Sequence, residues 1–184
     1  RGHLEAAADR LGFCPRPWQL DVACALASGR DAAAIVPSGS GKTLPWQMVT
    51  ALRRALRLGC TIVVVPLVAL GADQARRAFD LGLSFGEWNG TVPLRNKREM
   101  LTRILANDLD VVITTAESLD SDGKLCAELR AALRGRAGIA VVDESHYAID
   151  AAHFRLAWGR IGHTYHLLRP AVRYVCTATC EPER

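Results

Sequence analysis

"AAAIVPSGSGKTLPW", residues 32–46, joins a run of small or branched apolar residues to a Pro, Ser and Gly turn and then to a Lys-Thr pair. The apolar run predicts a buried strand, and the glycines at 39 and 41 tolerate backbone angles that other residues avoid. Such a loop can point its backbone N–H groups at an anion, and a helix opening at Lys42 adds the positive end of its dipole. The stretch therefore predicts a phosphate-binding loop between a strand and a helix.

This loop has the side chains that a nucleotide and its magnesium ion require. Lys42 is expected to reach the outer phosphates, and the hydroxyl of Thr43 is expected to bind Mg²⁺. The sequence meets the phosphate-loop signature at its last three positions, whereas Val36 stands at the first, where the signature has Gly. A chance Gly and Ser turn is the alternative, and the flanking strand and helix patterns argue against it. The residues expected to bind phosphate are Ser38, Gly39, Ser40, Gly41, Lys42 and Thr43.

The composition of the 184 residues is that of one globular domain. Hydrophobic residues make up 49% of the chain, and the net charge of +4 permits a polyanionic partner without establishing one. The cysteines form no C-x-x-C pair, which argues against structural zinc and favours core residues in a reducing compartment, with Cys176 and Cys180 more exposed. No apolar run reaches the roughly 18 residues of a membrane helix. We therefore expect an intracellular protein, nuclear in a eukaryote and cytoplasmic in a bacterium, with no membrane partner.

Further short runs of branched apolar residues follow along the chain, and each predicts a strand. Such continuous runs are typical of strands buried on both faces of a parallel sheet. The predicted strands are 32–36, 61–66, 110–115, 139–143 and 173–177. Stretches with helical spacing lie at 18–27, 44–58, 68–81, 97–106, 124–133 and 154–168. The alternation predicts an α/β fold of the P-loop NTPase type, with a parallel sheet sandwiched by helices.

Polar residues follow each predicted strand, at the edge where ligands of open parallel sheets bind. "VVDESH", residues 141–146, places two carboxylates directly after the fourth strand. Asp143 is expected to hold the Mg²⁺ that Thr43 also binds, and Glu144 to orient or deprotonate the attacking water. The alternative is that both acids cap the helix that follows. Paired with the phosphate loop, they predict hydrolysis of a phosphoanhydride.

The order of these segments resembles the first RecA-like domain of superfamily 2 helicases, and in particular of the RecQ-like DNA helicases. The matching segments are "PSGSGKT", "PLVALGADQ", "VVITTAESL", "VVDESH" and "CTATC". The RecQ-like pattern Pro-Leu-x-x-Leu-x-x-Asp-Gln is met by Pro66, Leu67, Leu70, Asp73 and Gln74. "LGFCPRPWQ" resembles the segment with which that family contacts adenine, with Arg16 and Gln19 in the Arg-x-x-Gln arrangement. A Gln amide suits this contact because it both donates and accepts hydrogen bonds.

The resemblance implies ATP and Mg²⁺ as cofactors and single-stranded or forked DNA as the partner. The catalytic residues that it implies are Lys42, Asp143, Glu144 and His146, the last also coupling nucleotide to DNA. The residues implied in DNA contact or coupling are Pro66, Leu67, Asp73, Gln74, Thr114, Thr115, Phe154, Arg155, Thr177 and Thr179. Their contacts are to the sugar-phosphate backbone, without base identity. The implied activity is ATP-dependent unwinding of DNA with 3′ to 5′ translocation.

"YAIDAAHFR", residues 147–155, departs from the RecQ-like pattern. That family has an aromatic-rich loop with a Trp-Gly pair here, whereas this chain offers Tyr147, His153 and Phe154 for stacking. The departure leaves open a second interpretation, a nucleotide-binding interaction module that has lost DNA-coupled hydrolysis. A third is a P-loop kinase or a double-strand translocase, although a kinase has no need of Arg16 and Gln19.

We expect residues 1–184 to be a single helicase ATP-binding domain and a piece of a longer chain. Nothing after Thr179 is long enough to be the second RecA-like domain, which in helicases of this type supplies an arginine finger. The isolated chain is therefore expected to bind ATP weakly and to hydrolyse it slowly.

Overall fold

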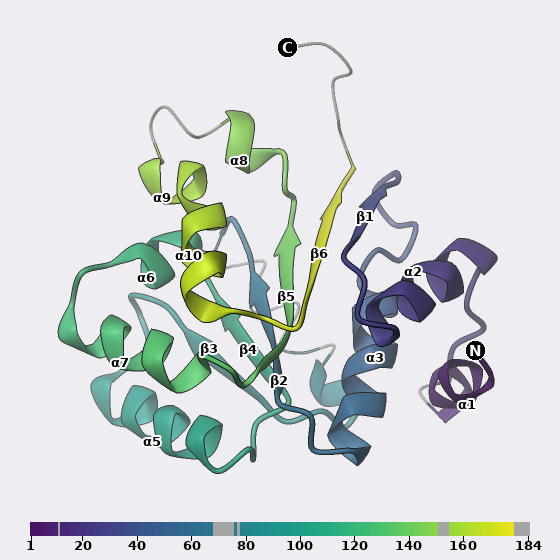
Figure 1. Cartoon of the computed structure of the whole chain (residues 1–184), viewed down its shortest axis with the longest axis horizontal. Coiled ribbons are helices and arrows are strands. Elements are labelled where there is room, and N and C mark those ends of the chain that lie inside the picture. Colours follow the sequence, from purple (N-terminus) through teal and green to yellow (C-terminus); the bar gives the residue numbers. More distant parts are fainter. Residues whose placement is uncertain (11, 68–75, 77, 151–154, 179–184) are drawn as a thin grey trace.

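The computed structural model describes residues 1–10, 12–67, 76, 78–150 and 155–178. One parallel sheet lies between two layers of helices, with strand order β1-β6-β5-β2-β4-β3 (Figure 1). The strands are β1 (Ala32–Ile35), β2 (Cys60–Val64), β3 (Phe85–Trp88), β4 (Val111–Thr114), β5 (Ala137–Asp143) and β6 (Val172–Thr177). Every pair of neighbouring strands is parallel. The predicted fold class is therefore confirmed.

The helices divide between the two faces of the sheet. One face is covered by α1 (Gly2–Arg10), α2 (Pro17–Ala27) and α3 (Leu44–Ala55). The other is covered by α5 (Leu94–Leu105), α6 (Ala116–Asp120), α7 (Lys124–Leu133), α9 (Leu156–Gly159) and α10 (Ile161–Leu168). The short helix α8 (Tyr147–Asp150) follows β5 at the carboxyl edge of the sheet (Figure 1).

Each layer of helices forms its own core with the sheet, because successive residues of a strand point to opposite faces. On β2, Val63 packs in the core beside α2 and α3, whereas Ile62 and Val64 pack in the core beside α5 and α7. All residues of β2 and β4 are buried. The predicted burial on both faces is confirmed for these two central strands.

β1 differs from this pattern because it lies at the edge of the sheet. Ala34 packs into the core beside α2 and α3, but Ile35 is 60% exposed. The helices of the second layer lie over the central strands and leave the outer face of β1 to solvent. The prediction of burial on both faces is therefore wrong for β1.

Other elements also differ from the prediction. The sequence pattern does not predict β3, and the predicted helix 154–168 forms two helices, α9 and α10, that meet at Arg160. Cys176, expected to be more exposed, is 2% exposed because β6 is covered by neighbouring strands and helices. Cys180 and most of the helix predicted at 68–81 lie outside the described residues.

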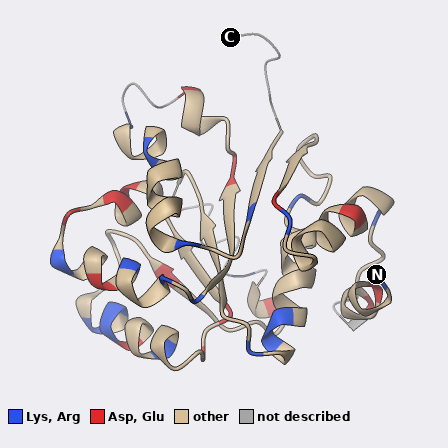
Figure 2. Ribbon diagram, in the orientation of Figure 1, with Lys and Arg blue, Asp and Glu red and all other residues tan. Residues whose placement is uncertain are grey.

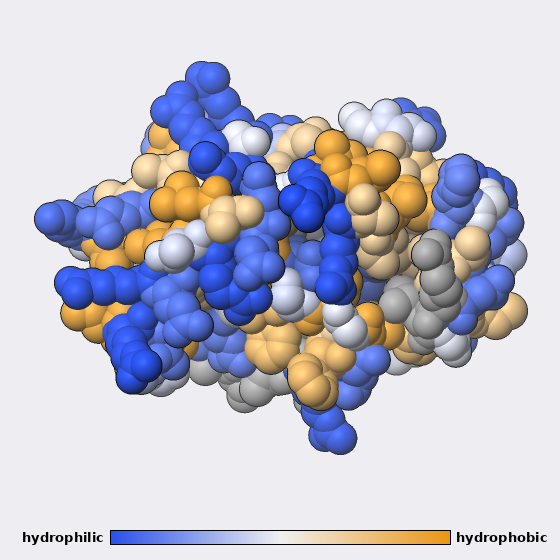
Figure 3. Space-filling view, turned by 90° about the horizontal axis from the view of Figure 1, so that it is seen from below, coloured by the Kyte–Doolittle hydropathy of each residue, from blue (hydrophilic) through white to orange (hydrophobic). Residues whose placement is uncertain are grey.

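Charged residues gather away from the phosphate loop. Figure 2 shows Lys and Arg along α5 and at the last turn of α3, where Arg53 and Arg54 lie. Arg54 pairs with Asp110, with 3.5 Å between Nε and Oδ2. Seen from below, the surface mixes hydrophilic residues with smaller hydrophobic patches (Figure 3). Among the described residues, no helix has both the length and the apolar character needed to cross a membrane.

Candidate nucleotide-binding site

The phosphate loop leaves β1 and returns to α3 through two glycines with left-handed backbone angles. The φ angles of Gly39 and Gly41 are +76° and +83°. A side chain in this region crowds the following carbonyl, so these positions require glycine. Helix α3 begins at Leu44, with Pro45 in its first turn. Pro has no N–H, and the first turn of a helix does not need one.

The start of this helix corrects one prediction from the sequence. Lys42 and Thr43 lie in the turn before α3, so the prediction that the helix opens at Lys42 is wrong. Thr43 occupies the N-cap position; the N–H of Leu44 that follows it donates to the carbonyl of Gly41 at 3.2 Å, and Pro45 has no N–H. The loop nevertheless keeps the order of strand, glycine turn and helix N-terminus that phosphate binding requires.

Gln19 on α2 ties the phosphate loop to the neighbouring helix. Its Nε2 donates to the carbonyl oxygens of Ser40, at 3.2 Å, and of Gly41, at 3.0 Å. Its Oε1 accepts from the backbone N–H of Arg16 at 2.7 Å. A Cβ on residue 41 would lie 2.5 Å from Nε2, so glycine is also needed here for close approach. The amide thus bonds to the protein in this structure, and its contact with adenine stays a prediction.

Lys42 is held at the base of the loop. Its carbonyl oxygen accepts from the hydroxyl of Tyr174 on β6 at 2.9 Å, and its Nζ donates to the carbonyl of Val36 at 3.4 Å. The residue is only 9% exposed. The ammonium therefore lies inside the loop rather than in bulk solvent, where it can meet a bound phosphate.

The two predicted acids lie at the carboxyl end of β5, where Asp143 is the last residue of the strand and Glu144 is the next one. Oδ1 of Asp143 accepts from the N–H of Glu144 at 3.0 Å and from the Cys176 thiol at 3.4 Å. Glu144 has a φ of +51°, in the left-handed region that costs a residue with a side chain about 1 kcal/mol or more. Such strain is typical of functional sites, and it fixes the direction in which Glu144 leaves the strand.

His146 joins the end of β5 to the end of β6. Its Nδ1 lies 2.8 Å from the hydroxyl of Thr177 and 3.5 Å from Oε2 of Glu144. The backbone N–H of Ser145 donates to the carbonyl of Cys176 at 3.0 Å. The structure thus brings together three residues that the sequence predicts for catalysis and coupling: Glu144, His146 and Thr177.

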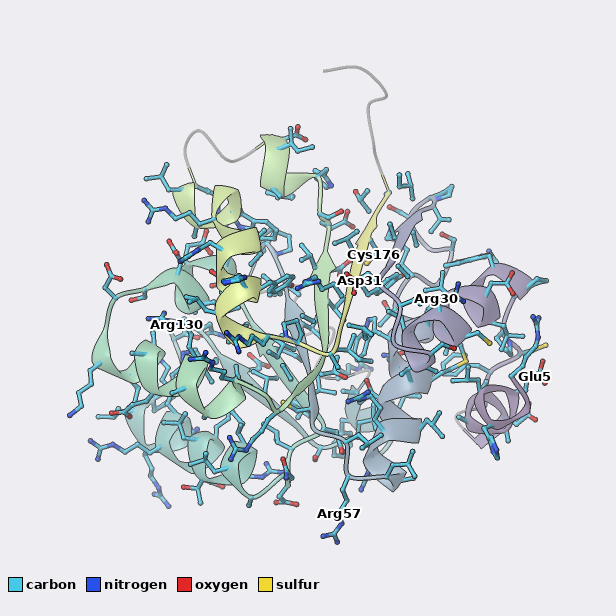
Figure 4. All side chains as sticks on the ribbon, viewed as in Figure 1. Glu5, Arg30, Asp31, Arg57, Arg130 and Cys176 are labelled. Atoms are coloured by element: carbon cyan, nitrogen blue, oxygen red, sulfur yellow. The ribbon has the colours of Figure 1, made fainter. Side chains whose placement is uncertain are left out.

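Cys176 lies between the strand that leads to the phosphate loop and the strand that ends in the acids, because it pairs with Ala34 of β1 and with Asp143 of β5. Cys176 lies on β6, between β5 and β1 (Figure 4). Burial raises the pKa of its thiol, the carboxylates of Asp143 and Glu144 raise it further, and Lys42 opposes them. Tyr174, two residues before Cys176 on β6, donates to the carbonyl of Lys42 at 2.9 Å. The predicted catalytic lysine and both acids therefore converge on the same edge of the sheet.

A pocket of about 400 Å³ opens beside the phosphate loop. It is lined by Phe13, Cys14, Arg16, Gln19, Gly39, Ser40, Gly41, Thr43, Leu44, Gln47, Asp80 and Leu81. A nucleotide with its phosphates in the loop has this pocket available for its base. The sequence prediction includes the loop, Arg16 and Gln19 but misses Leu44, Gln47, Asp80 and Leu81. Phe13 and Cys14 are also missed, although they lie in the same motif as Arg16.

Thr43 and Asp143 fit a magnesium site that a nucleotide completes. Mg²⁺ prefers oxygen ligands, and in nucleotide sites it takes one or two carboxylates together with phosphate oxygens and water. Within the described ranges, no group of three or more His, Cys, Asp and Glu side chains is arranged to hold a metal. The hydroxyl of Thr43 and the carboxylate of Asp143 are oxygen donors of this kind, and their binding of Mg²⁺ stays a prediction.

Arg155 connects two of the segments implied in DNA contact. Its guanidinium donates to the carbonyl of Pro66 at 2.8 Å and pairs with Glu117, with 2.6 Å between Nη2 and Oε1. It also lies over the ring of Tyr147, at 5.9 Å from the ring centre. Leu67, the residue after Pro66, is 52% exposed. The arrangement fixes the loop after β2 against the start of α6.

Other residues implied in DNA contact are less accessible. Thr114 and Thr115 are buried, and Thr115 caps α6 by accepting from the N–H of Ser118 at 3.3 Å. Their contact with DNA stays a prediction. The remaining predicted residues lie outside the described part of the chain: Leu70, Asp73, Gln74, His153, Phe154 and Thr179.

The parallel sheet, the glycine loop and the facing acids define a RecA-like P-loop domain. The chain matches the DEAD/DEAH box helicase family over residues 16–184, and it belongs to that family. It is 28% identical to the ATP-dependent DNA helicase hus2/rqh1 of Schizosaccharomyces pombe, over 80% of this chain and 11% of that protein. It is also 28% identical to the ATP-dependent DNA helicase Q5 of Rattus norvegicus, over 91% of this chain and 17% of that protein.

A solved helicase structure shares the fold of this chain. The crystal structure of the DUF1998 helicase MrfA bound to DNA and AMPPNP matches with a TM-score of 0.73 and 16% identity, over 100% of this chain and 26% of that one. The resemblance to RecQ-like DNA helicases and the RecA-like fold are therefore confirmed. The chain spans less than a fifth of the length of either curated relative.

Proposed function

We propose that this chain is the ATP-binding lobe of an ATP-dependent DNA helicase of the RecQ-like kind. The observation that carries the proposal is that β6 joins the phosphate loop to the acids: Tyr174 donates to the carbonyl of Lys42 at 2.9 Å, and the Cys176 thiol donates to Asp143 at 3.4 Å. Two relatives bear the name ATP-dependent DNA helicase, and the matched MrfA structure contains DNA and AMPPNP. These names support ATP as the nucleotide and DNA as the partner of this chain.

Hydrolysis of ATP follows from the positions of these groups. The triphosphate binds with its outer phosphates against the loop N–H groups and the Lys42 ammonium. Thr43 and Asp143 would hold Mg²⁺, which would neutralise charge on the phosphates. Glu144 accepts a proton from a water molecule as the water oxygen bonds to the γ-phosphorus, and the bond from that phosphorus to the bridging oxygen breaks. The products are ADP and inorganic phosphate.

His146 is the residue that relays the state of the nucleotide to the DNA side. Its ring contacts both Glu144 and Thr177, so a change at the γ-phosphate reaches the end of β6 through one side chain. The loop fixed by Arg155 is proposed to meet the backbone of single-stranded or forked DNA. We further propose that the full-length helicase moves along DNA in the 3′ to 5′ direction. We also propose that it is an intracellular protein, located in the nucleus in a eukaryote.

A second RecA-like domain in the longer protein is proposed to complete the site. Helicases of this class hydrolyse ATP between two such domains, and an arginine from the second is worth roughly a thousandfold or more in rate. Residues 1–184 are then one domain that binds ATP weakly and turns it over slowly when alone. Rapid turnover by these residues alone would contradict this part of the proposal.

The test of the proposed function is the ATPase rate of the full-length protein, with and without single-stranded DNA. We expect DNA to stimulate hydrolysis, and Glu144→Gln to lower the stimulated rate by about a thousandfold, because a general base contributes about 10² to 10⁴. Affinity for ATP is expected to change little, since Glu144 acts on water. Glu128→Gln, an exposed change on α7, is the matched control and is expected to keep the full rate.

Two results would contradict the proposal in different ways. ATP binding without any DNA-stimulated turnover would favour the interaction module that has lost coupling. Full turnover by Glu144→Gln would remove Glu144 from the mechanism and leave the acids as helix caps.

Binding of the nucleotide base is expected to protect one cysteine from alkylation. Cys14 is exposed and lines the pocket, whereas Cys60 and Cys176 are buried. Burial raises the pKa of the Cys60 thiol to about 12, so at pH 8 this thiol stays protonated and unreactive. Iodoacetamide should therefore label Cys14 first, and saturating ATP should slow this labelling at least fivefold. Peptide mass spectrometry measures both rates, and equal rates with and without ATP would place the base elsewhere.

A further inference from the structure

Gln47 on α3 is the buried polar side chain that the site described above leaves unexplained. It is 4% exposed, it lines the pocket beside the phosphate loop, and its Nε2 has no hydrogen-bond partner among the described residues. Gln19 in the same pocket is the contrast, because both ends of its amide are bonded to the protein. Among the described residues, one side chain that lines the pocket thus has a buried donor without a partner.

Burying an amide without a hydrogen-bond partner costs free energy, so the presence of Gln at position 47 needs an explanation. The residues of α3 on either side, Trp46 and Met48, are apolar and fully packed. An apolar side chain at position 47 would suit this part of the helix without leaving a donor unpaired. A ligand in the pocket that accepts a hydrogen bond explains why an amide stands there.

The chemistry of that ligand follows from the rest of the lining. The loop residues Gly39 to Thr43 form the phosphate end, so the part of a nucleotide that extends into the pocket is its base. A purine ring has unprotonated nitrogens that accept hydrogen bonds, and an amide N–H₂ is a matching donor. Leu44, Leu81 and Phe13 add apolar surface for the flat ring.

We infer that Gln47 is a base-binding residue whose Nε2 donates to a ring nitrogen of the purine. The inference rests on the proposed binding of ATP at this site. It adds a contact from α3 to those that the Arg-x-x-Gln segment is proposed to make from α2. Gln47 contributes to the affinity for the base and leaves the affinity for the phosphates unchanged.

The test compares ATP with tripolyphosphate, which has the phosphates but no base. Dissociation constants are measured by competition against a fluorescent ATP analogue, for the wild-type chain and for Gln47→Met. The expected result is an ATP affinity about fivefold to tenfold weaker in the variant, with the tripolyphosphate affinity unchanged. Gln47→Leu introduces a second apolar side chain of similar volume and should give the same result. This variant replaces Gln47→Met in the test if the Met variant folds poorly.

Met48→Leu is the matched control, because Met48 is the next residue of the same helix, is fully buried and does not line the pocket. It should bind both ligands like the wild type. An unchanged ratio of ATP to tripolyphosphate affinity in the Gln47 variants would overturn the inference, and so would an equal loss for both ligands. If the wild-type chain binds neither ligand, the proposed function itself fails.

Discussion

Replacing Lys42 with Ala is expected to lower the affinity for ATP by about a hundredfold or more while the fold stays intact. The ammonium lies inside the loop, and its neighbour in this structure is the carbonyl of Val36, at 3.4 Å. A hydrogen bond to a charged group is worth about 1.5 to 3 kcal/mol, and contacts to two phosphates together reach about 3 kcal/mol. This free energy corresponds to the hundredfold change. The loop backbone keeps its shape because Tyr174 holds the carbonyl rather than the side chain of residue 42.

The measurement is the dissociation constant for ATP by calorimetry, together with the far-ultraviolet circular dichroism of each variant. Lys124→Ala is the matched control, since Lys124 is an exposed lysine at the start of α7 and does not line the pocket. It should bind ATP like the wild type. If Lys42→Ala binds ATP with undiminished affinity, the phosphates do not lie in this loop.

The fold could be predicted from the sequence wherever burial on both faces leaves a continuous apolar run. "TIVVV" and "DVVIT" read as strands for this reason and form β2 and β4. β3, "FGEW", escapes prediction because it is short, contains Gly and Glu, and is only partly buried at the edge of the sheet. Its place is decided by pairing with β4, which is a tertiary contact that no local pattern contains.

The residues of the site differ in the same way: some could be predicted from the local sequence, and others depend on tertiary contacts. The loop at 38–43 and the acids at 143 and 144 could be found because the chemistry requires these residue types next to strand ends. Gln47 could not, because a Gln within a helix is ordinary in sequence, and only the tertiary structure buries it beside the pocket at the phosphate loop. Helix α3 begins at Leu44, where the stretch with helical spacing at 44–58 begins, and not at Lys42, because Lys42 and Thr43 suit either a turn or a first helical turn.

Gly59→Ala is expected to cost the chain about 3 kcal/mol or more of its free energy of unfolding. Gly59 stands just before β2 with a φ of +80°, where any other residue is strained by about 1 to 2 kcal/mol. A Cβ here would also overlap the carbonyl oxygen of Arg136, to which Cys60 donates at 2.9 Å. Relief requires β2 and β5 to move apart where their pairing begins. Since a domain is stable by only about 5 to 15 kcal/mol, this is a large share of the total.

Gly135→Ala separates the two causes, because Gly135 has a similar φ of +75° but no atom within 4 Å of the added carbon. It should cost only the backbone strain, about 1 to 2 kcal/mol. Urea unfolding of both variants measures the difference, which is the contribution of the close approach between residue 59 and Arg136. Equal losses would show that the strands yield without cost. A larger loss for Gly59→Ala would show that the start of β2, which leads to the loop at Pro66, is fixed by backbone contact rather than by side chains.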